Sequence, residues 1–106
     1  MAWLILLSYF FGGAFLMNAV PHLTSGVMGE RFQSPFAKPP GEGHSSSLVN
    51  FTWGFVNLVI GYLLVCRVGE FDLRDPLDAV ALGLGVLLCG LFGAYHFGRF
   101  NGGNMA

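Results

Sequence analysis

The chain has 106 residues, of which 54% are hydrophobic and only 10% are charged, and its mean hydropathy is +0.62. Soluble domains carry roughly 25% charged residues, so a soluble fold of this size could not bury so much apolar surface. The formal net charge of −1, with five Lys and Arg residues, offers no basic surface for nucleic acid. We therefore expect one compact membrane domain, residues 1–106, with the lipid bilayer as its surroundings and no nucleic-acid partner.

Three stretches are long and apolar enough to cross a bilayer. Residues 2–20 and 48–66 contain no charged side chain, and the third stretch contains only Asp78. A hydrocarbon layer about 30 Å thick needs about 20 helical residues, and lipid offers no partner to an open backbone group. We predict an all-α membrane protein with three transmembrane helices, at about 2–20, 48–66 and 76–97, joined by a long polar loop at 21–47 and a short loop at 67–75.

The ends of these stretches carry local signals. Pro21 follows the first stretch and disfavours helical geometry at Val20, so we expect the first helix to end there. The serines at 45–47 offer N-cap hydroxyl groups to the second helix. Asp75 is a candidate N-cap of the third helix, with Pro76 at its first helical position.

Topology follows from the number of crossings. The first twenty residues lack the basic segment and the small-residue cleavage site of a signal peptide, so we expect an uncleaved first helix. Three crossings place the two ends of the chain on opposite sides. Arg67 and Arg74 flank the short loop, and the positive-inside rule then favours a cytoplasmic N-terminus. We expect a multi-pass protein, integral to a bacterial inner membrane or plasma membrane.

One face of the second helix is built for close packing. Asn50, Gly54, Asn57 and Gly61 follow one another at spacings of four, three and four, so they lie on one stripe. Helices in lipid associate through small residues, which allow close backbone approach, and through polar contacts. We predict that this stripe packs against another helix, together with Gly83 and Gly90 of the third helix. A polar ligand or ion site at the two asparagines remains an alternative.

Three histidines are the candidate ligands for a metal ion or haem. His22, His44 and His96 are expected near the same membrane face, where they could bind a metal ion or ligate haem. No two of them have the spacing of a compact metal motif. Helix ends at the membrane surface also suit His22 and His96 without any cofactor. We therefore predict no cofactor and retain a haem or metal site as the alternative.

The predicted polar loop contains two phenylalanines, Phe32 and Phe36, which indicate that part of it packs against something. Loops beyond about 15 residues without regular structure are usually functional or disordered. Two interpretations remain open. The segment is either an ordered cap over the mouth of the bundle, or it docks on a partner or dips into the membrane interface.

The sequence contains no recognisable catalytic motif. It has no Gly-x-Ser-x-Gly elbow, no phosphate-binding Gly-Lys loop and no ionisable side chain deep in a span, so we predict that the protein is not an enzyme. We expect an accessory or scaffold subunit that packs against a larger membrane complex or against itself. The alternatives are a cofactor-bearing electron-transfer subunit and a small oligomeric channel or carrier lined by Asn18, Asn50 and Asn57.

Overall fold

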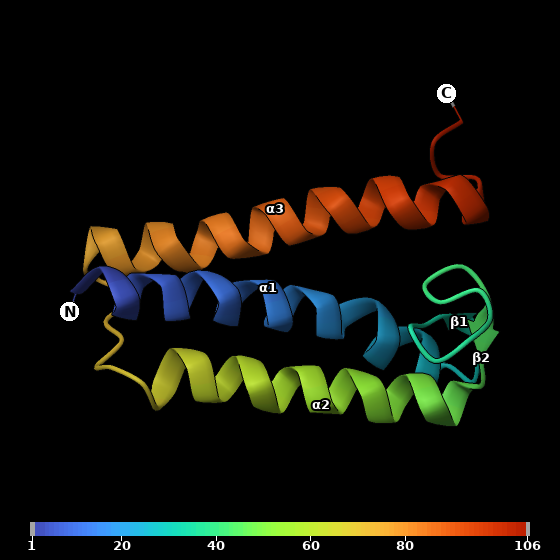
Figure 1. Ribbon diagram of the computed structural model, residues 1–106, viewed down its shortest axis with the longest axis horizontal. Coiled ribbons are helices and arrows are strands. Elements are labelled where there is room, and N and C mark those ends of the chain that lie inside the picture. Colours follow the sequence, from blue (N-terminus) through green and yellow to red (C-terminus); the bar gives the residue numbers. More distant parts are fainter. Residues whose placement is uncertain (1, 106) are drawn as a thin grey trace.

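The computed structural model describes residues 2–105 as three long helices and one short hairpin (Figure 1). Each helix is long and apolar enough to cross a membrane. The two ends of the described chain lie at opposite ends of the helices (Figure 1). The elements, in chain order, are α1 (Ala2–Val27), β1 (Phe32–Gln33), β2 (His44–Ser45), α2 (Ser47–Cys66) and α3 (Pro76–Asn101), with β1 and β2 antiparallel.

Helix α1 lies between the other two helices. Both α2 and α3 pack against it, whereas α2 and α3 share no extended interface within residues 2–105 (Figure 1). Helix α2 runs antiparallel to α1, and α3 runs parallel to it (Figure 1). The molecule measures 40 × 31 × 22 Å along its principal axes. The helices therefore form a single layer rather than a triangular bundle.

The contact between α1 and α2 depends on glycine. A Cβ atom on Gly61 would lie 2.7 Å from the side chain of Leu16, and one on Gly54 would lie 2.7 Å from the backbone nitrogen of Leu23. Side chains of any size at these positions would push the two backbones apart. The predicted stripe lies along this contact, and all four of its members are buried: Asn50, Gly54, Asn57 and Gly61.

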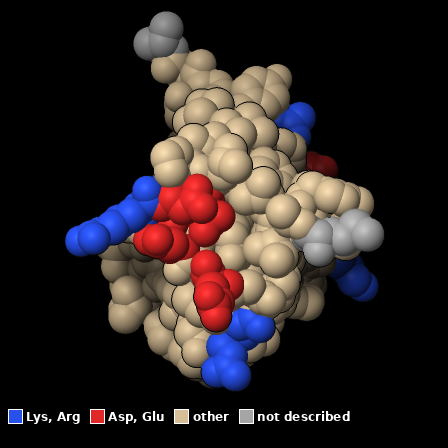
Figure 2. All heavy atoms as spheres, turned by 90° about the vertical axis from the view of Figure 1, so that its left-hand side faces the viewer, with Lys and Arg blue, Asp and Glu red and all other residues tan. Residues whose placement is uncertain are grey.

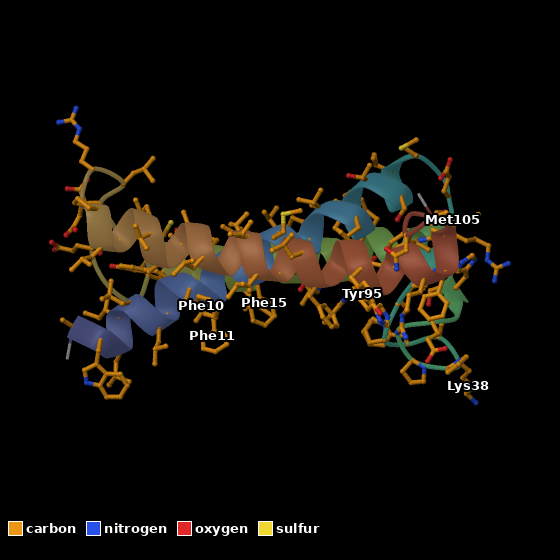
Figure 3. The ribbon with its side chains drawn as sticks, turned by 90° about the horizontal axis from the view of Figure 1, so that it is seen from above. Phe10, Phe11, Phe15, Lys38, Tyr95 and Met105 are labelled. Atoms are coloured by element: carbon orange, nitrogen blue, oxygen red, sulfur yellow. The ribbon has the colours of Figure 1, made fainter. Side chains whose placement is uncertain are left out.

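Two adjacent glycines let α1 hold both neighbours. Consecutive helical residues point about 100° apart, so Gly12 and Gly13 face different partners. A Cβ atom on Gly12 would lie 3.3 Å from the carbonyl oxygen of Gly61 on α2, whereas one on Gly13 would overlap the backbone of α3. On α3, the buried Gly85 leaves room for the carbonyl group of Phe10. Helices α1 and α3 cross one another, as Figure 3 shows from above.

The two predicted packing glycines of α3 behave differently from Gly85. A Cβ atom on Gly83 would have no neighbour within 4 Å, because Gly83 points about 200° away from Gly85 around the helix. A Cβ atom on Gly90 would make an ordinary contact, 3.6 Å from Cγ of Met17. The close contact on α3 is therefore made by Gly85, which the sequence pattern did not single out.

Two helices are longer than expected. Helix α1 does not end at Val20 but continues through Pro21 to Val27. Proline removes only its own N–H bond, which leaves the carbonyl group of Met17, four residues earlier, without that donor. The helix nevertheless continues, and one turn later the Ser25 hydroxyl donates to the carbonyl of Pro21 at 2.7 Å. Because α1 extends to Val27 and α2 begins at Ser47, the connection between them shrinks from 21–47 to 28–46. Helix α3 likewise continues beyond residue 97, to Asn101.

The predicted caps are confirmed. Ser46 is the N-cap of α2, and its hydroxyl accepts a hydrogen bond from the backbone N–H of Val49 at 3.1 Å. Asp75 is the N-cap of α3 and accepts from the N–H of Leu77 at 3.0 Å, with Pro76 at the first position of the helix. These side chains satisfy N–H groups that the helix itself leaves unpaired.

Charged side chains gather beyond the apolar stretches. The connection between α2 and α3 and the first turn of α3 carry four acidic residues, which Figure 2 shows side by side. Two arginines flank them in the same segment. This end of the molecule is therefore strongly polar, as the surface of a membrane requires. The residues are Arg67, Glu70, Asp72, Arg74, Asp75 and Asp78.

We predict that Gly85→Ala destabilises the protein by about 1 to 3 kcal/mol, because the new methyl group would overlap the Phe10 carbonyl of α1. Gly83→Ala is the matched control on the same helix and should cost nothing measurable, since its methyl group meets no atom within 4 Å. Thermal unfolding of both variants in detergent provides the comparison. Equal stability of the two variants would show that α1 and α3 do not meet at Gly85.

Candidate functional site: the polar network beneath the cap

The connection 28–46 is attached to all three helices. The ring of Phe32 packs edge-on against His22 of α1, with centroids 5.6 Å apart. Asn50 of α2 donates to the carbonyl of Phe32 at 3.1 Å. Gln33 and Asn101 of α3 pair through two hydrogen bonds of 3.1 Å each. The segment 28–46, here called the cap, therefore links α2 to α3, which hardly touch one another directly.

Asn50 is the centre of this network. Its Nδ2 atom donates to the backbone carbonyls of Phe32, Ser45 and Ser46, each at 3.1 Å. Its Oδ1 atom lies 2.7 Å from Nδ1 of His22. Because the amide N–H groups point at carbonyls, Oδ1 must be the acceptor, and Nδ1 of His22 must carry a proton. Asn50 is 0% exposed and His22 is 2% exposed.

A second pair of asparagines joins α1 to α2 deeper in the layer. Nδ2 of Asn57 donates to the carbonyl of Trp53 at 2.8 Å, so its Oδ1 atom is free to accept. Nδ2 of Asn18 donates to that oxygen at 2.9 Å. This chain of bonds fixes the orientation of the Asn18 amide and leaves its own Oδ1 atom with no hydrogen-bond partner among residues 2–105. Asn18, Asn50 and Asn57, the residues considered as a channel lining, thus lie mainly between α1 and α2 of one chain.

The three histidines lie at the capped end but have separate environments. His22 is inside α1 rather than after it, and His44 is exposed on β2. His96 lies on α3, where Nε2 is 2.7 Å from the Gly41 carbonyl oxygen. Carbonyl oxygen only accepts, so Nε2 of His96 carries a proton and does not offer a lone pair.

The packing around these rings is aromatic. The Phe97 ring contacts both His22 and His96, with centroid distances of 6.3 and 5.1 Å, and lies 4.8 Å from the ring of Phe32. Within the described chain, no group of three or more His, Cys, Asp or Glu side chains is arranged to hold a metal ion. His22 and His96 make hydrogen bonds to Asn50 of α2 and to the cap, and both have ring contacts with Phe97 of α3.

Several members of the network were not anticipated from the sequence. Gln33 and Ser34 are each 1% exposed, and the Ser34 hydroxyl is 2.5 Å from that of Ser45. Asn101 lies beyond the predicted end of α3. These are polar residues in a polar segment, and nothing in their spacing distinguishes buried ones from exposed ones. The signal that part of this segment packs against the rest of the protein came from its two phenylalanines, Phe32 and Phe36.

The second phenylalanine of the cap points outward. Phe36 is 62% exposed, and its ring meets Trp53 of α2 edge-on, with centroids 5.1 Å apart. Beside this pair lies a shallow groove of about 470 Å³ on the outer side of α2. Both interpretations of the loop therefore have a structural counterpart, because Phe32 fixes the cap and Phe36 forms an apolar surface. The groove is lined by Phe36, Leu48, Val49, Thr52, Trp53 and Val56.

Comparison with known proteins gives no functional lead, since no family model, curated protein or solved structure matches this chain. The geometry itself is informative. Every fully buried side-chain nitrogen and oxygen atom of residues 2–105 has a hydrogen-bond partner. The polar groups beneath the cap are thus used to hold the cap in place.

We predict that Asn50→Leu loosens the cap and lowers stability by about 1 to 3 kcal/mol, because the proton on Nδ1 of His22 loses its acceptor and the carbonyls of Phe32, Ser45 and Ser46 lose the Asn50 amide as a donor. Amide hydrogen exchange of residues 32–45 should accelerate. Thr52→Val is the control, since that exposed hydroxyl donates only to the carbonyl of Leu48 within its own helix. Unchanged exchange in Asn50→Leu would mean that the cap is held by other contacts.

Proposed function

We propose that this chain is a small, non-enzymatic, multi-pass membrane subunit that binds another transmembrane chain through the outer face of α2. The observation that supports this most directly is the groove on α2 beside Phe36 and Trp53. The partner is a transmembrane helix, either of a larger complex or of a second copy of this chain.

The shape of this surface favours a protein partner. Lipid tails are as apolar as leucine, so helices associate in a bilayer through dispersion contacts at complementary surfaces. A groove bounded by two aromatic rings offers many more such contacts than a smooth helix face. Phe, Tyr and Trp side chains also dominate many protein interfaces. The opposite side of α2 is already used by α1, so a partner of α2 must bind elsewhere on the helix, and the groove is the part of its exposed surface that two aromatic rings shape.

The cap has a clear part in this proposal. Phe36 sits in a turn whose neighbour Ser34 is buried and hydrogen-bonded, with its hydroxyl accepting from the N–H of Phe36 at 3.1 Å. The buried network therefore holds Phe36 against α2, and the docking surface is formed before the partner arrives. Preorganisation of this kind lowers the entropic cost of association.

The orientation in the membrane remains part of the proposal. Arg67 and Arg74 lie at the end opposite the cap, so the positive-inside rule places that end in the cytoplasm. The cap and its docking surface would then lie at the outer surface of a bacterial inner membrane or plasma membrane.

Site-specific photocrosslinking in the native membrane tests the docking surface. A benzophenone side chain placed at Leu48 or Val56 should give a discrete protein adduct. The same side chain at Leu91 should give none. Leu91 is also exposed, at 59%, but it lies on α3 and does not line the α2 groove. Mass spectrometry of the adduct distinguishes a foreign subunit from a second copy of the chain.

Two results would contradict the proposal. Adducts of equal yield at Leu91 and at the groove positions would show that α2 has no preferred partner surface. A complete lack of protein adducts at Leu48 and Val56, with lipid adducts in their place, would show that the chain works without a partner on this face.

A further inference from the structure

A second groove lies between α1 and α3, on the side of the layer that α2 does not reach. Its volume is about 440 Å³, within the roughly 300 to 1,000 Å³ typical of sites for small organic molecules. Asn18 and Thr24 of α1 and Asn101 of α3 are its polar side chains, and the rest of the lining is mainly apolar or glycine. No Lys, Arg, Asp, Glu or His side chain lines it.

The groove has a simple origin in the packing. Close contact at Gly13 and Gly85 brings α1 and α3 together at one level, and the crossing helices separate beyond it (Figure 3). Large side chains could fill the widening gap, but α3 presents small ones there. A Cβ atom on Gly93 would have only the ring of Phe97 near it, at 3.8 Å. The small residues that leave the space open are Gly90, Gly93 and Ala94.

The groove also contains an unpaired acceptor. The carbonyl of Trp53 fixes the amide of Asn57, which fixes the amide of Asn18 with its N–H group turned toward α2. Oδ1 of Asn18 therefore has two lone pairs and no partner among the described residues. Since every fully buried polar side-chain atom of those residues is paired, this oxygen is accessible, and Asn18 lines the groove.

The position of this oxygen limits what can reach it. Its partner Asn57 lies one helical turn, about 6 Å, farther from the capped end than Trp53, and tryptophan is a residue type that gathers at membrane interfaces. An acceptor without a donor at that depth costs free energy, because hydrocarbon offers no hydrogen bond. A molecule that supplies the donor must enter from the lipid or from the capped end, and it must be uncharged.

We propose that this groove binds a neutral, lipid-soluble molecule with a hydroxyl or N–H donor, and that Oδ1 of Asn18 accepts its hydrogen bond. Long-chain alcohols, phenols and quinols belong to this chemical class. The apolar lining covers the hydrocarbon part of the ligand. This site is on a different face from the α2 groove and does not depend on the proposed subunit function.

Photolabelling of the whole protein in phosphatidylcholine bilayers tests the site. The probe is a long-chain alcohol with a diazirine in its chain, and the competitors are 1-hexadecanol and its methyl ether. We expect saturable labelling of peptides that contain residues 17–24 and 89–101. The alcohol should compete about three- to tenfold better than the ether, because only the alcohol donates a hydrogen bond.

Two variants separate the groove from the general lipid surface. Gly93→Leu places a side chain in the groove and should abolish saturable labelling. Gly83→Leu adds the same side chain at a position on α3 outside the groove, where a Cβ atom meets nothing within 4 Å, and should leave labelling unchanged. Asn18→Leu should remove the preference for the alcohol over the ether.

Three results would overturn the proposal. One is labelling that does not saturate or that spreads over all lipid-facing peptides. The second is undiminished saturable labelling in Gly93→Leu. The third is equal competition by alcohol and ether in the unmodified protein, which would mean that Asn18 accepts from water or from nothing.

Discussion

Close backbone contact on two sides of α1 is the constraint on which the rest of the structure depends. Gly12 and Gly13 are adjacent in α1, so the two positions without a side chain face directions about 100° apart. Helix α2 packs closely at Gly12, and α3 packs closely at Gly13. A central helix with glycine on one side only could hold one close neighbour. The single layer, the bare outer faces of α2 and α3, and the groove where α1 and α3 separate all follow from this pair.

A flat layer leaves its outer helices α2 and α3 with little direct contact, and the cap links them at one end. Asn50 attaches the cap to α2, and the Gln33–Asn101 pair attaches it to α3. The polar side chains that could suggest chemistry, above all His22 and Asn50, are paired with one another in this attachment. The surfaces left for function are therefore the apolar groove beside Phe36 and the α1–α3 groove, lined by Asn18, whose Oδ1 atom has no partner among residues 2–105.

The sequence predicted the features that depend on local chemistry. Absence of charge identified three helices, Ser46 and Asp75 marked helix starts, and the Asn50 to Gly61 stripe marked a face that lies against α1. The sequence did not predict the features that depend on contacts between residues far apart in the chain. Pro21 should end a helix by its own geometry, but α1 continues to Val27, with His22 and Ser25 buried in the part that follows the proline. Gly83 and Gly85 differ only in the direction they face, which the crossing of α1 and α3 sets. The burial of Gln33 likewise depends on Asn101, 68 residues away.

A distance between α2 and α3 tests the single layer most directly. Spin labels at Leu58 and Leu91, in a protein whose Cys66 and Cys89 are replaced by serine, report this separation by pulsed electron paramagnetic resonance in bilayers. Packed helix axes lie about 8 to 10 Å apart, so a layer with α1 in the middle places the α2 and α3 axes roughly 16 to 20 Å apart. A label distance that corresponds to such a separation would support the account. One that corresponds to directly packed axes, about 8 to 10 Å apart, would mean a triangular bundle and would contradict the central position of α1.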